Sequence, residues 1–156
     1  MAKIVLLDAG PLGAVTHPRA NKNKDIKEWL QRLLRSGVAV RVPEIADYEI
    51  RRELVRAAKS KGIPAAKSKG IQRLDDLKQL GYIPLTTEVM LKAAEFWAFA
   101  RQQGQPTADN KELDADVILA AQAIVMGSAG DDVVIATTNV GHLARFTTAK
   151  VWEQVS

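Results

Sequence analysis

Short apolar runs alternate along the chain with longer segments whose apolar residues recur at helical spacing. The runs short enough for buried strands are 3–7, 38–42, 82–85, 133–136 and 151–152. The segments with helical spacing are 25–35, 43–61, 71–80, 87–104 and 116–126. Strands that alternate with helices are typical of a parallel sheet covered on both faces. The pattern therefore predicts an α/β fold, a three-layer α/β/α sandwich around a central parallel sheet.

Local signals refine these boundaries. Pro43 suits the first turn of the helix after the second strand, and Thr86 or Thr87 can cap the helix over 87–104. Pro84 has no backbone N–H to donate, which predicts an edge position for the strand over 82–85. The polar segment 105–112 is expected to be a loop. A length of 156 residues suits one domain over 1–156.

Acidic or carboxamide side chains follow the apolar runs. Asp8 ends the first strand, Glu49 lies beyond the second, Asp116 begins an apolar helix, and Asn139 follows the fourth strand. Because groups at the carboxyl ends of parallel strands meet in one crevice, we expect these side chains to share a pocket. Carboxylates repel one another unless a cation lies among them. Oxygen ligands without any cysteine favour Mg²⁺ or Mn²⁺ over zinc.

Neighbouring acids compete for two of these positions. Glu44 and Glu53 share the expected helix with Glu49, although Glu53 can instead pair with a nearby arginine. Asp114 lies two residues before Asp116, and one of the two can serve as the helix cap, so the last helix is expected to open at either residue.

Two polar residues near the fourth strand have alternative structural roles. Thr137 either bonds a carboxylate or caps the strand, and Asn139 is commonly a turn residue. The two histidines, His17 and His142, have no feature that favours a general base. We therefore treat Thr137 as a supporting residue and keep Asn139 as a candidate ligand.

Positive charge is concentrated between residues 51 and 73. This segment has eight basic residues and one acidic residue, although the whole chain carries a net charge of only +4. The seven-residue sequence AAKSKGI at 57–63, which we call the heptad, recurs at 65–71. We interpret the segment as an exposed basic helical excursion that contacts phosphates, with a solvated helical face as the alternative. The residues expected to bind nucleic acid are Arg51, Arg52, Lys59, Lys61, Lys67 and Lys69.

Composition limits the remaining functions. The absence of cysteine excludes disulfide scaffolds and thiol nucleophiles, and we expect a cytoplasmic protein because the chain shows no apolar leader and no run long enough to cross a bilayer. Aromatic residues make up only 5% of the chain, so base stacking has few platforms. Recognition of a nucleic acid should then rest on phosphates and shape.

Four motifs occur in order along the chain: IVLLD at 4–8, VPEIADYEI at 42–50, DVILAAQA at 116–123 and TTNVGHL at 137–143. Together they resemble the signatures of PIN domains, especially VapC-type ribonucleases, over nearly the whole chain. The resemblance rests on the order and spacing of all four motifs. It assigns Asp8, Glu49 and Asp116 to the family's acids, whereas Asn139 stands where many members carry a further Asp.

The resemblance implies a PIN fold and a metal-dependent endoribonuclease that hydrolyses RNA phosphodiester bonds. The implied catalytic residues are Asp8, Glu49, Asp116 and Asn139. The metal ligands would come from Asp8, Glu49, Asp114 and Asp116, with Mg²⁺ or Mn²⁺ as cofactor, and Thr137 and Glu44 would support them. The family resemblance also predicts an antitoxin partner, as in a toxin-antitoxin pair, and a homodimer.

The sequence offers two alternatives to a nuclease. Asn139 removes one negative charge from the pocket, which keeps open a catalytically weak or inactive PIN-fold module that binds RNA or a partner. A Rossmann-like nucleotide-binding module would need G-x-G-x-x-G after the first strand, but Asp8 stands there and would repel a pyrophosphate.

Overall fold

The sheet is parallel throughout. The computed structural model describes residues 3–19, 21–103 and 110–156, and within them five strands form one sheet in the order β3-β2-β1-β4-β5. The strands are β1 (Lys3–Leu7), β2 (Ala39–Pro43), β3 (Tyr82–Ile83), β4 (Asp132–Thr137) and β5 (Ala149–Val151). The predicted α/β class is confirmed, and β3 lies at the edge as Pro84 indicated.

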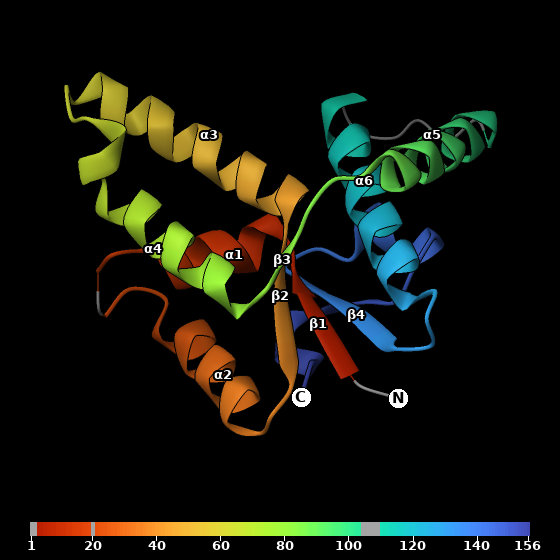
Figure 1. Cartoon of the computed structure of the whole chain (residues 1–156), viewed down its shortest axis with the longest axis horizontal. Helices are drawn as coiled ribbons and strands as arrows, with labels where there is room; N and C mark the ends of the chain where they lie inside the picture. Colours follow the sequence, from red (N-terminus) through yellow and green to blue (C-terminus); the bar gives the residue numbers. More distant parts are fainter. Residues whose placement is uncertain (1–2, 20, 104–109) are drawn as a thin grey trace.

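Helices cover both faces of the sheet (Figure 1). They are α1 (Ala9–Thr16), α2 (Lys24–Arg35), α3 (Glu44–Ser60), α4 (Lys69–Leu77), α5 (Thr87–Gln102) and α6 (Asn110–Gly127). Short 3-10 turns add η1 (Ala65–Lys67), η2 (Lys78–Leu80), η3 (Gly141–Arg145) and η4 (Trp152–Gln154). Helices α1, α2 and α4 pack on one face, α6 packs on the other, and α5 packs against the outside of α6.

The central strand β1 explains the layering. Its side chains alternate between the faces, so Val5 and Leu7 join the core under α1 and α2, whereas Ile4 and Leu6 join the core under α6. β1 pairs with β2 on one side and β4 on the other. Burial on both faces accounts for its continuous apolar sequence. Asp8 is the first residue beyond this buried strand.

Several boundaries differ from the sequence-based prediction. Helix α1 was not predicted, because its eight residues AGPLGAVT include two glycines and a proline and have no polar face. Helix α6 begins at Asn110, so neither Asp114 nor Asp116 opens it, and the expected loop 105–112 is wrong at 110–112; its residues 105–109 lie outside the described ranges. Pro43 ends β2 and caps α3 instead of lying in its first turn.

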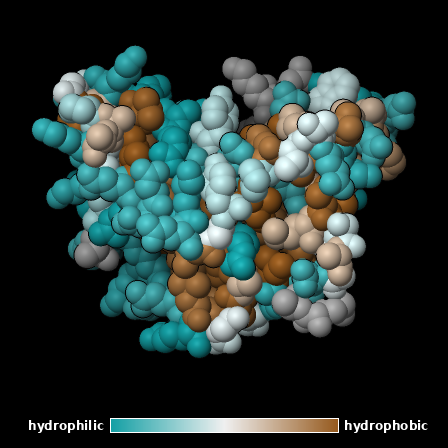
Figure 2. Space-filling view, in the orientation of Figure 1, coloured by the Kyte–Doolittle hydropathy of each residue, from teal (hydrophilic) through white to brown (hydrophobic). Residues whose placement is uncertain are grey.

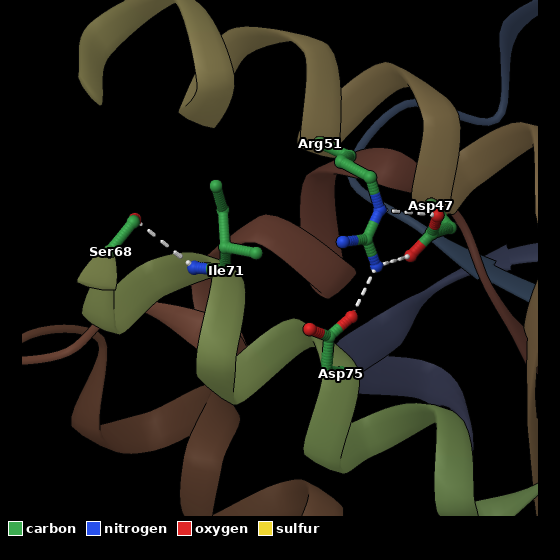
Figure 3. Close-up of polar contacts among 5 residues, drawn as sticks. All are labelled: Asp47, Arg51, Ser68, Ile71 and Asp75. Atoms are coloured by element: carbon green, nitrogen blue, oxygen red, sulfur yellow. Dashed lines mark hydrogen bonds and ion pairs between the residues drawn. The ribbon is translucent and has the colours of Figure 1, made fainter. Parts of the chain in front are cut away.

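The two copies of the heptad AAKSKGI fold differently. The copy at 57–63 ends α3, and Gly62 takes the positive φ of 67° that closes a helix and lets the chain turn. The copy at 65–71 forms η1 and begins α4, where the Ser68 side chain accepts a 3.3 Å hydrogen bond from the Ile71 N–H (Figure 3). Pro64 separates the copies. Identical sequences therefore form a helix C-terminus and a helix N-terminus.

The resulting α3–α4 hairpin is held together near its base. The Arg51 guanidinium donates to both carboxylate oxygens of Asp47, at 2.9 and 3.0 Å, and to Asp75 on α4 at 2.7 Å (Figure 3). Asp47 is buried, so the arginine neutralises a charge that cannot reach water. No helix within the described ranges combines the length and apolar character needed to span a bilayer.

Candidate functional site

A cavity of about 310 Å³ lies where the carboxyl ends of β1 and β4 meet α3 and α6. Asp8, Glu49, Asp116 and Asn139 all line it, although they come from four separate segments of the chain. Thr137, Thr138 and His142 also contribute to its walls. The structure thus brings the four main candidates from the sequence to one place.

Asp8 is fixed by two hydrogen bonds at the start of α1. Its Oδ1 accepts from the Ala9 N–H at 2.7 Å, and its Oδ2 accepts from the Thr137 hydroxyl at 2.7 Å. Burial raises the pKa of Asp8, and the two hydrogen bonds act in the opposite direction. The side chain is therefore held in one orientation in a place where its negative charge is poorly solvated.

Glu49 adds a second carboxylate to the same cavity. Burial raises the pKa of Glu49, the negative charge of Asp8 raises it further, and Arg52 lowers it. The two carboxylates therefore repel each other across the cavity. A cation between them would relieve this repulsion and favour the ionised form of both acids.

The donor set fits a hard divalent ion. No three acidic or histidine side chains in the described ranges come together as a metal-binding cluster, so the carboxylates that share the cavity do not form a tight cage. Mg²⁺, however, commonly uses only one or two protein carboxylates and completes its octahedron with water and substrate phosphate. Asp8 together with Glu49 or Asp116 would meet that requirement.

Thr137 links the strand end to both polar neighbours. Its side chain is buried, its hydroxyl donates to Asp8, and the same oxygen accepts from the Asn139 N–H at 3.1 Å. The Asn139 residue itself is exposed at the rim of the cavity. Thr137 thus acts on the site by orienting Asp8, and Asn139 brings a neutral amide to its edge.

The other acidic candidates lie elsewhere. Glu44 accepts a 2.6 Å hydrogen bond from the Leu85 N–H and so connects α3 to the segment after β3. Asp114 is exposed and lines a different, largely apolar cavity of about 400 Å³ between α5 and α6. Glu53 pairs with Arg56 at 2.6 Å on the surface of α3. None of the three lines the cavity that contains Asp8.

Among the residues expected to bind nucleic acid, the two arginines contact other side chains, whereas the four lysines are exposed. Arg51 is engaged by Asp47 and Asp75, which raise its pKa and give it a role inside the hairpin. Arg52 lies over the ring of Tyr48, 5.2 Å from its centroid. The remaining candidates are exposed around the tip of the hairpin: Lys59, Lys61, Lys67 and Lys69.

The comparisons with known proteins rest on structure. No protein-family model matches the sequence, and neither does any curated protein. A chain of VapBC2 from Rickettsia felis, solved bound to a DNA fragment from its promoter, matches with a TM-score of 0.69 at 15% identity over 96% of this chain and 98% of that one. A chain of FitAcB from Neisseria gonorrhoeae matches with a TM-score of 0.68 at 20% identity, over 97% of this chain and 99% of that one. A chain of VapBC-1 from nontypeable Haemophilus influenzae matches with a TM-score of 0.62 at 18% identity, over 97% of this chain and 99% of that one.

The chain has a VapC-like PIN fold. At these identities the likeness establishes the fold. The expected PIN-like architecture is confirmed over nearly the full length of the chain.

Gln122 is a residue of this VapC-like fold whose role was not predicted. It is fully buried on α6, where its amide donates to the Ile83 carbonyl at 2.7 Å and its Oε1 accepts from the Ile45 N–H at 3.4 Å. Gln122 therefore joins α6 to α3 and to β3. A lone amide in the otherwise apolar stretch 117–126 was the signal for this role in the sequence.

Proposed function

We propose that this chain is a divalent-metal-dependent endoribonuclease that hydrolyses RNA phosphodiester bonds. The observation that supports the proposal is the shared acidic cavity, in which burial and the charge of Asp8 raise the pKa of Glu49 while Asp116 lines the same space. Buried carboxylates with perturbed pKa values that share a cleft are typical of functional sites.

Each residue has a distinct role in this proposal. Asp8, together with Glu49 or Asp116, would hold Mg²⁺ or Mn²⁺, and Thr137 would keep Asp8 in place through its 2.7 Å hydrogen bond. When bound, the ion supplies charge neutralisation for the scissile phosphate and lowers the pKa of a coordinated water. A carboxylate of this set would orient the attacking water. Asn139 would add a neutral oxygen ligand or hydrogen bond at the rim.

The test compares two aspartates that lie two residues apart on α6. Purified protein should cleave single-stranded RNA with Mg²⁺ or Mn²⁺ and stop when EDTA is added. Asp116→Asn should abolish cleavage, whereas Asp114→Asn, which changes the same charge in a different cavity, should leave it intact. Equal activity of all three proteins would reject the proposed ligands, and unchanged far-UV circular dichroism would show that the variants fold.

A second candidate function is a PIN-fold module that binds RNA or a partner with little or no cleavage. The observations that favour it are the lack of a three-carboxylate cluster in the described ranges and the neutral Asn139 in the fourth position. This module would bind RNA with an affinity independent of Mg²⁺ and would not shorten it. Measurements of binding and cleavage on the same RNA therefore separate the two functions.

We further propose that the chain is the toxin of a toxin-antitoxin pair and forms a homodimer. The structural neighbours, which are chains of VapBC and FitAB complexes, support the toxin role. The homodimer is expected from the family resemblance alone. Light scattering after size exclusion would test the dimer. Co-expression with any small reading frame next to the gene would test the antitoxin, which should co-purify and suppress RNA cleavage.

A further inference from the structure

A second cavity, of about 370 Å³, lies inside the α3–α4 hairpin, away from the acidic site. Both copies of the duplicated heptad build it: residues of 57–63 and residues of 65–71 line it, together with Leu54 and Pro18. The two copies of the heptad thus form a cavity that has no role in the proposed nuclease function.

The opposite conformations of the two copies form the cavity. The first copy forms the end of α3 and a turn, and the second returns as η1 and the start of α4. Gly70 allows the close approach of the helices, since a Cβ added there would lie 2.9 Å from Cδ2 of Leu54. Arg51 fixes the hairpin towards its base, and Ser68 caps α4 at the tip (Figure 3). The cavity is therefore formed in the free chain.

The lining combines an aliphatic floor with a basic rim. Ala57, Ala58 and Ile63 contribute to the floor, and the Ile63 side chain remains 40% exposed. Three exposed lysines stand at the rim, namely Lys61, Lys67 and Lys69. None of the ion pairs in the described part of the chain includes these lysines. Figure 2 shows hydrophobic residues surrounded by hydrophilic ones at the end of this hairpin.

The lining of the cavity favours an acidic protein segment over a single-stranded nucleic acid. Single-stranded nucleic acid gains affinity by stacking its bases on aromatic rings, and no aromatic residue lines this cavity. An aliphatic floor instead matches an aliphatic side chain, and the rim lysines match carboxylates. We propose that the cavity docks an acidic segment of a partner protein, which inserts one aliphatic side chain between the two heptads while its carboxylates pair with the lysines. In this proposal the three lysines bind carboxylates of a protein, whereas the sequence predicted that they would bind phosphates of a nucleic acid.

The experiment uses a fluorescent peptide of repeating Leu-Glu-Glu units, a matched Ser-Glu-Glu peptide and a single-stranded RNA of similar charge. Fluorescence anisotropy measures the binding of each probe to the full chain. Ala57→Leu fills the floor without changing charge, and because Ala57 is exposed the variant should fold normally. The triple variant with glutamate at Lys61, Lys67 and Lys69 reverses the rim.

A matched control reverses three exposed lysines outside the cavity: Lys22, Lys24 and Lys150. The docking site predicts that the Leu-Glu-Glu peptide binds about tenfold more tightly than the Ser-Glu-Glu peptide, since one buried aliphatic side chain supplies that factor. Ala57→Leu and the rim variant should each weaken binding by about tenfold or more, and the control by less than about twofold.

Three results would overturn the inference. The first is that the Leu-Glu-Glu peptide shows no saturable binding or binds no better than the Ser-Glu-Glu peptide. The second is that Ala57→Leu leaves peptide binding unchanged. The third is that only the RNA binds, with an affinity lost in the rim variant and kept in Ala57→Leu, which would return the lysines to phosphate recognition.

Discussion

The hydroxyl of Thr137 donates a 2.7 Å hydrogen bond to Oδ2 of Asp8, although the two residues are 129 positions apart in the sequence. β1 and β4 pair in register, with Leu7 opposite Ala136, so the residues that follow them meet beyond the sheet. The bond leaves one Asp8 oxygen directed by Thr137 and the other by the Ala9 N–H. Thr137 is thus a positioning residue for the candidate metal site.

We expect Thr137→Val to lower RNA cleavage by about 10- to 100-fold, the range typical of residues that orient metal ligands. Valine keeps the size of threonine and removes the hydroxyl that holds Asp8. Thr137→Ser retains a hydroxyl and should recover most of the loss. Titration with Mn²⁺ should show a weaker metal affinity for the valine variant only; equal affinity in both variants would argue against the positioning role.

Asp8→Asn should raise the Tm of the metal-free protein while abolishing cleavage. Burial raises the pKa of folded Asp8 above its ordinary value, so the folded state binds a proton more readily than the unfolded state. The wild type should therefore lose stability as the pH rises through the folded pKa of Asp8, and the variant should lack this loss.

Thermal melts across a pH series in EDTA would measure that difference. Addition of Mg²⁺ should then raise the Tm of the wild type and leave that of Asp8→Asn nearly unchanged, because a ligand stabilises the state that binds it. A destabilised variant at neutral pH in EDTA would contradict the role assigned to the buried charge.

The ion pairs of Arg51 predict unequal effects on stability. Arg51→Met leaves the Asp47 carboxylate buried and unpaired, which should lower the free energy of unfolding by about 3–5 kcal/mol. Asp75→Asn removes only a partner whose side chain is 55% exposed, and should cost at most about 1 kcal/mol. Urea unfolding of the two variants measures both values. Similar losses would show that Asp47 does not depend on Arg51.

Gln122→Leu should lower the free energy of unfolding by about 1–3 kcal/mol, because the Ile83 carbonyl and the Ile45 N–H lose a buried partner. Gln102→Leu, at an exposed position of α5, is the control and should change stability by less than about 0.5 kcal/mol. A stabilised Gln122→Leu protein would mean that added apolar packing outweighs the lost hydrogen bonds.

The elements that the sequence predicted well are those with strong periodicity. The run 3–7 and the spacing of Ile26, Trp29 and Leu33 both indicated the element that the structure contains, because burial of one face dictates those positions. Helix α1 carries no such pattern. Its Gly10 packs closely against Thr138 and its Gly13 packs closely against Ile50, where a larger side chain would clash. Tertiary packing, which a single sequence does not display, determines that helix.

The candidate site followed from topology more than from any one residue. Asp8 and Asn139 follow neighbouring parallel strands, so their meeting could be expected from the fold class alone. Asp114 and Asp116 were expected to point to different sides if both were helical, since they lie two residues apart. Which of them faces the cavity could not be foreseen, because that depends on the early start of α6 and on which side of that helix faces β4. The same holds for the partners of Arg51, which lie on two helices of the hairpin.

The most direct measurement is the anomalous scattering of Mn²⁺ soaked into crystals of the protein. We predict a peak in the cavity lined by Asp8, Glu49 and Asp116, and no such peak in crystals of Asp8→Asn. Mn²⁺ bound beside Asp114 instead, or a cavity that stays empty at saturating metal, would contradict the claim that the carboxylates of this cavity hold the ion.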